Sequence, residues 1–264
     1  MKSFLKYLSA HQFIIHLFFI VLIIGTLLSG FKIKETPISL TVEPFAVVEL
    51  FTSEGCSSCP PADKLLTKLV DLAEMEDLNI FALSFHVSYW DYLGWKDPFA
   101  SDAFTNRQRK YARKLGSGVY TPQMVVNGQS EFVGSDQKRA EEVINMALSN
   151  RFSEVKFEKV SIQKTQSTVS VTFEIIGELK NKTVHLALVE RDLSVSVNKG
   201  ENRGRALHHN NVVRKLKSIN LSDQSSYSVQ LPIDSKIKIA NASLIVYLQN
   251  LDNLRIYDVA GSKL

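Results

Sequence analysis

Residues 47–63 read VVELFTSEGCSSCPPAD, and this stretch holds both cysteines of the 264-residue chain, Cys56 and Cys59. The apolar run around its start predicts a strand over residues 46–52, and the leucine spacing after the prolines predicts a helix over residues 57–76. We therefore expect a strand that leads through a turn of small residues into a helix. The Cys-x-x-Cys motif is expected where that helix begins.

This position has a chemical consequence for the two thiols. The first N–H groups of a helix have no partner within the helix, and the helix dipole places partial positive charge there. Both effects stabilise a thiolate, and such cysteines can have pKa values of about 3.5–7.5. Cys56 is expected to be the attacking thiolate, and Cys59 is expected to resolve the mixed disulfide.

The composition excludes some classes of function. Hydrophobic residues make up 45% of the chain, which is ordinary for a globular protein. There are 31 Lys and Arg against 27 Asp and Glu, so the net charge is +4, with no long run of like charge. This weak basic balance argues against a nucleic-acid partner.

The amino-terminal residues have the pattern of a membrane-targeting segment. Lys2 and Lys6 precede an apolar stretch over residues 13–28. This pattern predicts either a cleaved signal peptide or an uncleaved membrane anchor within residues 1–31, followed by a linker over residues 32–44. Either alternative places the body of the protein outside the cytoplasm, in the periplasm or secreted, and the anchor would tether it to the membrane.

Residues 45–152 alternate between strand and helix patterns, which is typical of an α/β domain. Asn127-Gly128 between two short apolar runs indicates a β-hairpin. The expected elements are, in order, a strand over 46–52, a helix over 57–76, a strand over 79–87, a helix over 97–115, the hairpin over 123–133 and a helix over 136–150.

Residues 153–264 have a different period. Apolar and polar residues alternate there, as in half-buried strands. This spacing predicts a separate, β-rich, sandwich-like domain. Its expected strands are 169–173, 183–189, 227–231, 243–248 and 255–258.

Four stretches of the chain resemble a bacterial family of secreted or membrane-attached thioredoxin-like proteins, catalogued as a domain of unknown function. They read ELFTSEGCSSCPPAD (49–63), HVSYWDYLGWKDPF (86–99), YTPQMVVNG (120–128) and GENRGRALHHNNVVR (200–214). The resemblance runs from about residue 45 to the carboxyl end. It implies a thioredoxin-like domain followed by a β-rich domain, and it supplies no substrate.

The resemblance also implies roles for three further residues. In thioredoxin-like folds a cis-proline precedes a strand and faces the dithiol, and Thr121-Pro122 occupies the corresponding place here. The buried acid of such proteins lies six residues before the nucleophile, where this chain has Leu50. Glu49 is one residue away and is the predicted proton acceptor, although a solvated glutamate at a strand end is an equal alternative.

An aromatic cluster follows the second predicted strand. Tyr89, Trp90 and Trp95, with His86 before them, are predicted to line a groove for a substrate. The alternative is that the aromatic residues cap the core and that His86 is structural. The polar loop that follows residue 197 has three interpretations. It binds an anion, it contacts the first domain, or it is simply solvated. The residues that would make the first two contacts are Arg203, Arg205, His208 and His209.

The function that these patterns favour is an extracytoplasmic thiol–disulfide oxidoreductase acting on protein or small-molecule thiols, without a cofactor. One alternative is a copper or other metal chaperone, in which His86, His208 or His209 would join the cysteines. No dedicated metal site is predicted, because a structural zinc ion needs four ligands and the chain has one cysteine pair. The other alternative is a module that binds a partner and retains an unused dithiol.

Overall fold

The computed structural model describes residues 40–165 and 167–264, which belong to one compact unit. The predicted signal or anchor segment, residues 1–31, lies outside the described residues, as does most of the predicted linker. Within the described ranges, no helix is long and apolar enough to cross a bilayer.

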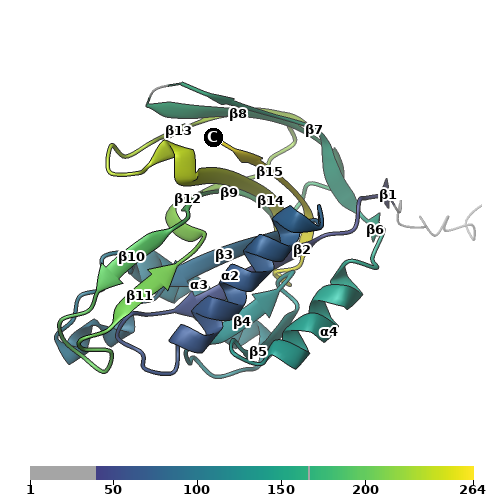
Figure 1. Ribbon diagram of the computed structural model, residues 1–264. Coiled ribbons are helices and arrows are strands. Elements are labelled where there is room, and N and C mark those ends of the chain that lie inside the picture. Colours follow the sequence, from purple (N-terminus) through teal and green to yellow (C-terminus); the bar gives the residue numbers. More distant parts are fainter. Residues whose placement is uncertain (1–39, 166) are drawn as a thin grey trace, which may run out of the picture. The chain divides into compact units, whose positions relative to one another are not determined.

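The first half of the chain contains all the α-helices of the described ranges (Figure 1). Its strand Ala46–Thr52 has the bounds that the sequence predicts. The elements are β1 (Leu40–Thr41), β2 (Ala46–Thr52), α2 (Pro60–Met75), β3 (Ile80–His86), the 3₁₀-helix η1 (Ser88–Leu93), α3 (Asp102–Leu115), β4 (Gln123–Val126), β5 (Ser130–Val133) and α4 (Gln137–Ala147).

The second half consists of strands and one short 3₁₀-helix. The predicted strands are all present, and five others were missed, namely β6, β7, β10, β11 and β12. The elements are β6 (Phe152–Ser153), β7 (Val155–Lys164), β8 (Thr168–Gly177), β9 (Lys182–Glu190), β10 (Leu193–Ser196), β11 (Ala206–His209), β12 (Val212–Asn220), β13 (Ser226–Pro232), η2 (Ile239–Asn241), β14 (Ala242–Asn250) and β15 (Ile256–Lys263).

One mixed sheet takes strands from both halves, in the order β15-β14-β9-β12-β3-β2-β4-β5. The halves join where β12 runs parallel to β3, with Val212 opposite Ser84 and the Ser84 amide donating to the Asn211 carbonyl. The predicted fold class, a thioredoxin-like α/β domain followed by a separate β-rich domain, is therefore wrong. The physical reason is that β3 would be an edge strand in a separate α/β domain, and β12 pairs with that edge.

The core has three parts, and one of them crosses the junction between the halves. On one face of the large sheet, Phe51 of β2 and Tyr111 of α3 pack in the same cluster as Ala187 of β9 and Tyr247 of β14. On the opposite face, α2 and α4 cover the first-half strands, and the three-stranded sheet β13-β8-β7 covers β9 and β14 (Figure 1).

Local signals in the sequence predict some element ends and miss others. Asn127 and Gly128 have φ values of 47° and 67°, so the hairpin turn is confirmed. Gly116 ends α3 in the left-handed conformation, as predicted. The predicted start of that helix at Asp97 is wrong, because α3 begins at Asp102 and is capped by the Ser101 hydroxyl.

Candidate functional site

The two cysteines form a disulfide at the start of α2, with their Cα atoms 5.4 Å apart. Cys59 is the N-cap residue, and its carbonyl accepts the Ala62 and Asp63 amides. The expectation that the first cysteine lies where the helix begins is therefore corrected, because α2 starts at Pro60 and Cys56 lies a turn before it. Both cysteine side chains are buried, although the serines between them are exposed.

The loop between β10 and β11, residues 197–205, covers the disulfide. The Asn202 side-chain amide donates to the carbonyls of Glu54 and Cys56, both at 2.9 Å. The Glu201 carboxylate accepts the Ser57 amide at 2.9 Å, which lowers the pKa of Glu201. Of the alternatives drawn from the sequence, an anion site, a solvated loop or a contact with the first domain, the structure shows the contact. We name this segment the covering loop.

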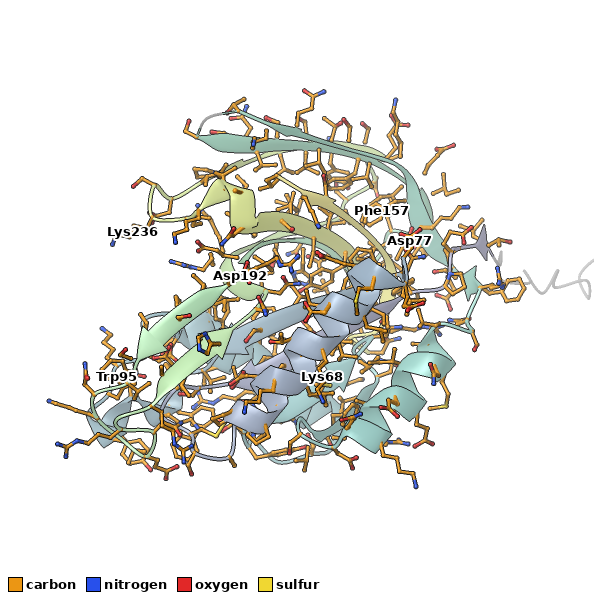
Figure 2. All side chains as sticks on the ribbon, in the orientation of Figure 1. Lys68, Asp77, Trp95, Phe157, Asp192 and Lys236 are labelled. Carbon is orange, nitrogen blue, oxygen red and sulfur yellow. A yellow bond between two sulfur atoms is a disulfide. The ribbon has the colours of Figure 1, made fainter. Side chains whose placement is uncertain are left out.

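The two tryptophans hold the segment that precedes Cys56. Trp90 packs against Gly55, where an added Cβ would lie 3.0 Å from the Trp90 Cβ, and its indole N–H donates to the Thr121 hydroxyl at 2.7 Å. The Trp95 indole N–H donates to the Glu54 carboxylate at 2.7 Å. Trp95 belongs to the segment between η1 and α3. It lies beside the loop end of the β10–β11 hairpin (Figure 2), next to Gly200 of the covering loop. Both side chains are half-buried and are engaged with the disulfide segment.

The predicted proline lies beside the same helix. The Thr121–Pro122 peptide bond is cis. Pro122 and Ala62 both border Gly134, and Ala62 lies in the first turn of α2. A Cβ added to Gly134 would lie 3.1 Å from the Cβ atom of Pro122 and 3.3 Å from that of Ala62. The structure therefore brings Thr121, Pro122 and the start of α2 together, with Trp90 as the link to Gly55.

Five buried ionisable residues lie next to the disulfide segment. We name this set the acid–histidine cluster: Glu54, Asp63, His86, Asp97 and His209. The His86 Nδ1 atom is 2.7 Å from the Asp97 carboxylate. The His209 ring lies between two carboxylates, with Nε2 3.3 Å from Glu54 Oε1 and Nδ1 3.8 Å from Asp63 Oδ2. The two imidazole rings meet edge to face, with centroids 4.8 Å apart.

Burial and charge shift the pKa values within this cluster in different directions. Burial raises the pKa of Asp63, although His209 and His86 partly oppose the shift. Burial acts to lower the pKa of His86, but the Asp97 carboxylate outweighs it and the pKa of His86 is raised. Burial acts to raise the pKa of Asp97, but His86 and the amides of Glu54 and Phe99 lower it. His86 and Asp97 therefore favour the charged pair.

Several polar atoms of the cluster have no hydrogen-bond partner among the described residues. They are Glu54 Oε1, Asp63 Oδ1, His86 Nε2 and both ring nitrogens of His209. Buried polar atoms are usually paired, so this concentration makes the cluster the candidate site of the molecule. Within residues 40–165 and 167–264, no group of three or more His, Cys, Asp or Glu residues is arranged to hold a metal ion.

Two of the residues considered from the sequence lie away from the disulfide. Glu49 projects from β2 to the sheet face that carries α3, where Arg107 lies 2.7 Å away and the Tyr111 and Tyr247 hydroxyls contact the carboxylate. This face is opposite to the one covered by α2, so the structure does not bring Glu49 to the cysteines. His208 is exposed on β11 and contacts Ser194 at 2.8 Å.

Sequence reasoning missed Asp63, Asp97 and Asn202 as residues of the site. It named His209 only as one of several residues that could bind an anion, contact the first domain or join the cysteines at a metal. Asp63 follows Cys59 by one helical turn, and this spacing was the available signal. Asp97 was expected only as the start of the helix over residues 97–115, and α3 begins at Asp102 instead. Asn202 and His209 come from a distant hairpin, and no local pattern places them against the disulfide.

Fold and site together define a mostly β-sheet protein in which one large mixed sheet carries a covered disulfide beside buried acids and histidines. The chain belongs to the family described as "Protein of unknown function (DUF1223)", whose model matches residues 47–249. No curated protein shows significant similarity to it.

Among solved structures, the chain is similar to a protein from Agrobacterium tumefaciens determined by X-ray crystallography. The two are 32% identical, the match covers 82% of this chain and 92% of the other, and the TM-score is 0.60. A domain of the outer membrane lipoprotein Omp28 from Porphyromonas gingivalis matches at 15% identity over 42% of this chain and 88% of that domain, with a TM-score of 0.26. So low a TM-score carries no argument about fold or function.

Proposed function

We propose that this chain is an extracytoplasmic thiol–disulfide oxidoreductase that uses the Cys56–Cys59 disulfide. The observation that carries the proposal is the position of the disulfide at the start of α2, directly beside buried ionisable groups, several of whose polar atoms have no hydrogen-bond partner among the described residues. Titratable groups with shifted pKa values concentrate where protons are exchanged.

A purely structural role explains the disulfide poorly. A bridge between residues three apart closes a very short loop, so it removes little entropy from the unfolded chain. The chain has no other cysteine, so its stability depends on the packed core. A reactive bridge explains why both cysteines of the chain lie in one short motif.

The proposed exchange proceeds in two steps through a mixed disulfide. A substrate thiolate attacks Sγ of Cys56, the bond between the two cysteine sulfurs breaks, and its electron pair leaves on Sγ of Cys59. A second substrate thiolate then attacks the substrate sulfur and releases Cys56 as a thiolate. The substrate dithiol loses two electrons and the protein disulfide gains them, and the reverse sequence reduces a substrate disulfide.

The acid–histidine cluster would supply and accept the protons of these steps. Glu54 precedes Cys56 by two residues, and Asp63 follows Cys59 by one helical turn, so carboxyl groups flank the motif on both sides. The raised pKa of Asp63 means that it keeps a proton to a higher pH than an exposed aspartate. In this mechanism a cluster proton passes to the departing Cys59 thiolate.

The proposed partners are thiols and disulfides of proteins or small molecules outside the cytoplasm. The support for this location is the positively flanked apolar segment at the amino end, together with the use of both cysteines in a disulfide. In this proposal the segment directs the protein to the membrane.

The test follows exchange between the protein and a model peptide that carries a dithiol or a disulfide. We expect the wild type to catalyse the exchange and the Cys56→Ser and Cys59→Ser variants to lose it. Because Cys56 remains available in Cys59→Ser, that variant should accumulate a mixed disulfide with the peptide, detectable by mass spectrometry.

The double variant, Cys56→Ser with Cys59→Ser, gives the background rate. A wild type no faster than this background would refute the proposal. Retained exchange in Cys56→Ser would refute the assignment of Cys56 as the attacked sulfur.

A further inference from the structure

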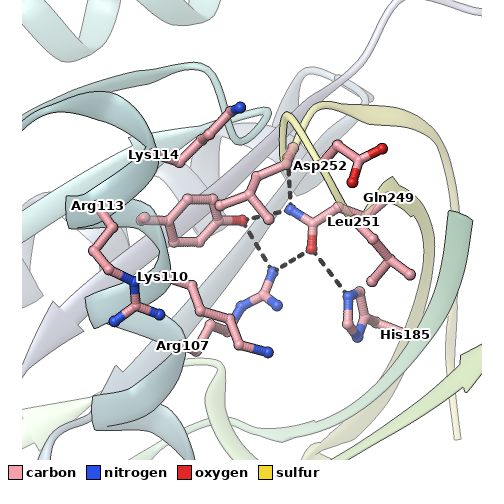
Figure 3. Close-up of a pocket in the computed structure, with 10 residues that line it drawn as sticks. Arg107, Lys110, Arg113, Lys114, His185, Gln249, Leu251 and Asp252 are labelled. Carbon is pink, nitrogen blue, oxygen red and sulfur yellow. Dashed lines mark hydrogen bonds between the residues drawn. The ribbon is translucent and has the colours of Figure 1, made fainter. Parts of the chain in front are cut away.

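A cavity of about 390 Å³ opens between α3 and the turn that joins β14 to β15 (Figure 3). It lies on the sheet face opposite to α2, away from the disulfide. Its volume falls in the range of small-molecule sites, roughly 300–1,000 Å³. Arg107, Lys110, Arg113 and Lys114 of α3 line one side, and Leu251 and Leu254 line the other.

The floor of the cavity is a connected network of buried polar side chains. Arg107 lies 2.7 Å from the Glu49 carboxylate and donates to the Tyr111 hydroxyl at 3.0 Å and to Gln249 Oε1 at 3.2 Å. Gln249 donates in turn to the Tyr111 hydroxyl at 2.8 Å and to the Leu254 carbonyl at 2.6 Å. Each side-chain atom of Gln249 therefore has its partners, and the floor is fixed in place.

His185 completes this floor as a neutral ring. Burial lowers its pKa well below the ordinary value, and the nearby Arg107 and Lys110 charges lower it further. Its Nε2 atom lies 3.0 Å from Gln249 Oε1 and its Nδ1 atom lies 2.7 Å from the Ser218 hydroxyl. Because Gln249 Oε1 can only accept, Nε2 donates and Nδ1 accepts. The floor therefore adds no free charge, since Glu49 balances Arg107.

The rim carries the uncompensated charge. Lys110, Arg113 and Lys114 are exposed, and none of them takes part in an ion pair among the described residues. Asp252 is the acidic residue of the lining; its carboxylate accepts a hydrogen bond from Asn181 and offsets one positive charge, so the rim keeps a net positive charge. Lys110 and Lys114 are four residues apart on one helix, a spacing at which like charges repel.

The position of these residues near the end of a helix explains only part of this charge. Cations in the last turn interact favourably with the helix dipole, and Arg113 and Lys114 lie there. Lys110 lies a turn earlier, and all three cations face the same cavity as the Tyr111 ring and Leu251. Figure 3 shows the cationic side chains of α3 across the cavity from Leu251 and Asp252.

We propose that this cavity binds a small organic oxyanion, a carboxylate or a phosphate ester with an apolar substituent. The anionic group lies between Lys110, Arg113 and Lys114, which donate charge-assisted hydrogen bonds to it. The apolar part lies against Tyr111 and Leu251. The site is independent of the disulfide and of the proposed exchange activity.

The experiment titrates the full-length protein with short probes and measures the dissociation constants by calorimetry. Butanoate and butyl phosphate carry both features of the ligand, inorganic phosphate carries the charge alone, and butanol and butylamine carry the apolar part without the anion. We expect the two butyl anions to bind more tightly than the other probes, and their binding to weaken as salt is added. The tighter of the two identifies the anionic group.

Matched variants locate the binding to this cavity. The double variant Lys110→Gln with Lys114→Gln should bind the preferred anion about tenfold more weakly or worse, because it removes two charge-assisted donors. Leu251→Ser should weaken the butyl anion and leave inorganic phosphate unchanged. Lys138→Gln, on the exposed surface of α4, should bind as the wild type does.

Three outcomes would overturn the proposal. They are binding of both butyl anions no tighter than that of butanol, binding of both butyl anions no tighter than that of inorganic phosphate, and an equal loss of affinity in Lys138→Gln. Circular dichroism and the melting temperature confirm that each variant is folded, and the substituted lysines are exposed, so the fold is expected to be retained.

Discussion

His86 and Asp97 form a fully enclosed ion pair whose two members come from the end of β3 and from the segment before α3. Asp97 also accepts the Glu54 amide at 2.9 Å and the Phe99 amide at 2.9 Å. One carboxylate therefore ties the segment before the disulfide to the loop that carries the tryptophans. Removing one member of such a buried pair leaves the other charge uncompensated.

The pair gives stability a defined dependence on pH. The raised pKa of His86 contributes stability that is fully present below its ordinary value of 6.5 and is lost as the pH rises through the folded-state pKa. The lowered pKa of Asp97 contributes stability that is present above its ordinary value of 3.8 and is lost as the pH falls through the folded-state pKa. The contribution of the pair is therefore largest between these two values.

Asp97→Asn should lower the free energy of unfolding by about 3 kcal/mol or more near pH 6, where it leaves a buried imidazolium unpaired. The loss should be smaller at pH 9, because a larger fraction of His86 is neutral at the higher pH. Urea denaturation at the two pH values measures the difference. Asp71→Asn, at an exposed position of α2, is the control, and an equal loss in Asp97→Asn at both pH values would contradict the charged pair.

At the scale of elements, the β10–β11 hairpin decides whether the disulfide can be reached. Both sulfurs are buried in the closed arrangement, so exchange requires the covering loop to move. Asn202 fixes the covering loop to the disulfide segment through two buried hydrogen bonds, to the carbonyls on either side of Gly55. Glu201 adds an exposed hydrogen bond to the Ser57 amide. Arg203 and Gly204 of the same loop are exposed, and among the described residues neither makes a comparable contact with the disulfide segment.

Asn202→Ala should make the disulfide react faster with a reductant, by roughly tenfold, because each hydrogen bond lost contributes on the order of 1 kcal/mol to the closed state. The measurement is the rate of thiol labelling after addition of dithiothreitol under native conditions. Arg203→Ala is the matched control in the same loop, since its side chain is exposed, and it should react at the wild-type rate. Equal rates for wild type and Asn202→Ala would show that another segment limits access.

At the scale of the whole molecule, the shared sheet makes the two halves depend on each other for their cores. Phe51 of β2 and Tyr247 of β14 lie in one cluster, and Arg107 of α3 reaches Gln249 of β14 at 3.2 Å. Neither half can bury this face alone, because the sheet edge at β3 would lose β12 and the face would lose part of its apolar cover.

A fragment ending at residue 152 should therefore fail to unfold cooperatively, and the full-length protein should unfold in one transition. Both tryptophans lie in the first half, whereas most strands lie in the second. Tryptophan fluorescence and far-ultraviolet circular dichroism should thus give coincident denaturation curves. Two separated transitions, or a fragment with its own cooperative transition, would refute the dependence.

Local patterns were enough to predict much of the secondary structure and part of the site. The apolar run predicted β2, Asn127-Gly128 predicted the hairpin of β4 and β5, and Gly116 marks the end of α3. Each of these signals acts within a few residues. The same holds for the pairing of Cys56 with Cys59, the only cysteines of the chain. Thr121-Pro122 was singled out through the resemblance to thioredoxin-like proteins and not by a local pattern. Helix starts were less well predicted. The helix was expected to begin at Asp97, but the Asp97 carboxylate pairs with His86 and α3 begins at Asp102.

The sequence by itself determined which residues could form strands, helices and a disulfide, since those properties depend on neighbours along the chain. The tertiary structure alone decided that β12 pairs with β3, that Asn202 lies over the cysteines, and that His209 stands between Glu54 and Asp63. Alternation along a strand fixes which side chains are buried and leaves open which sheet edge it joins. Those edges are chosen by packing between segments more than a hundred residues apart, such as β3 and β12, and that choice merged two expected domains into one sheet.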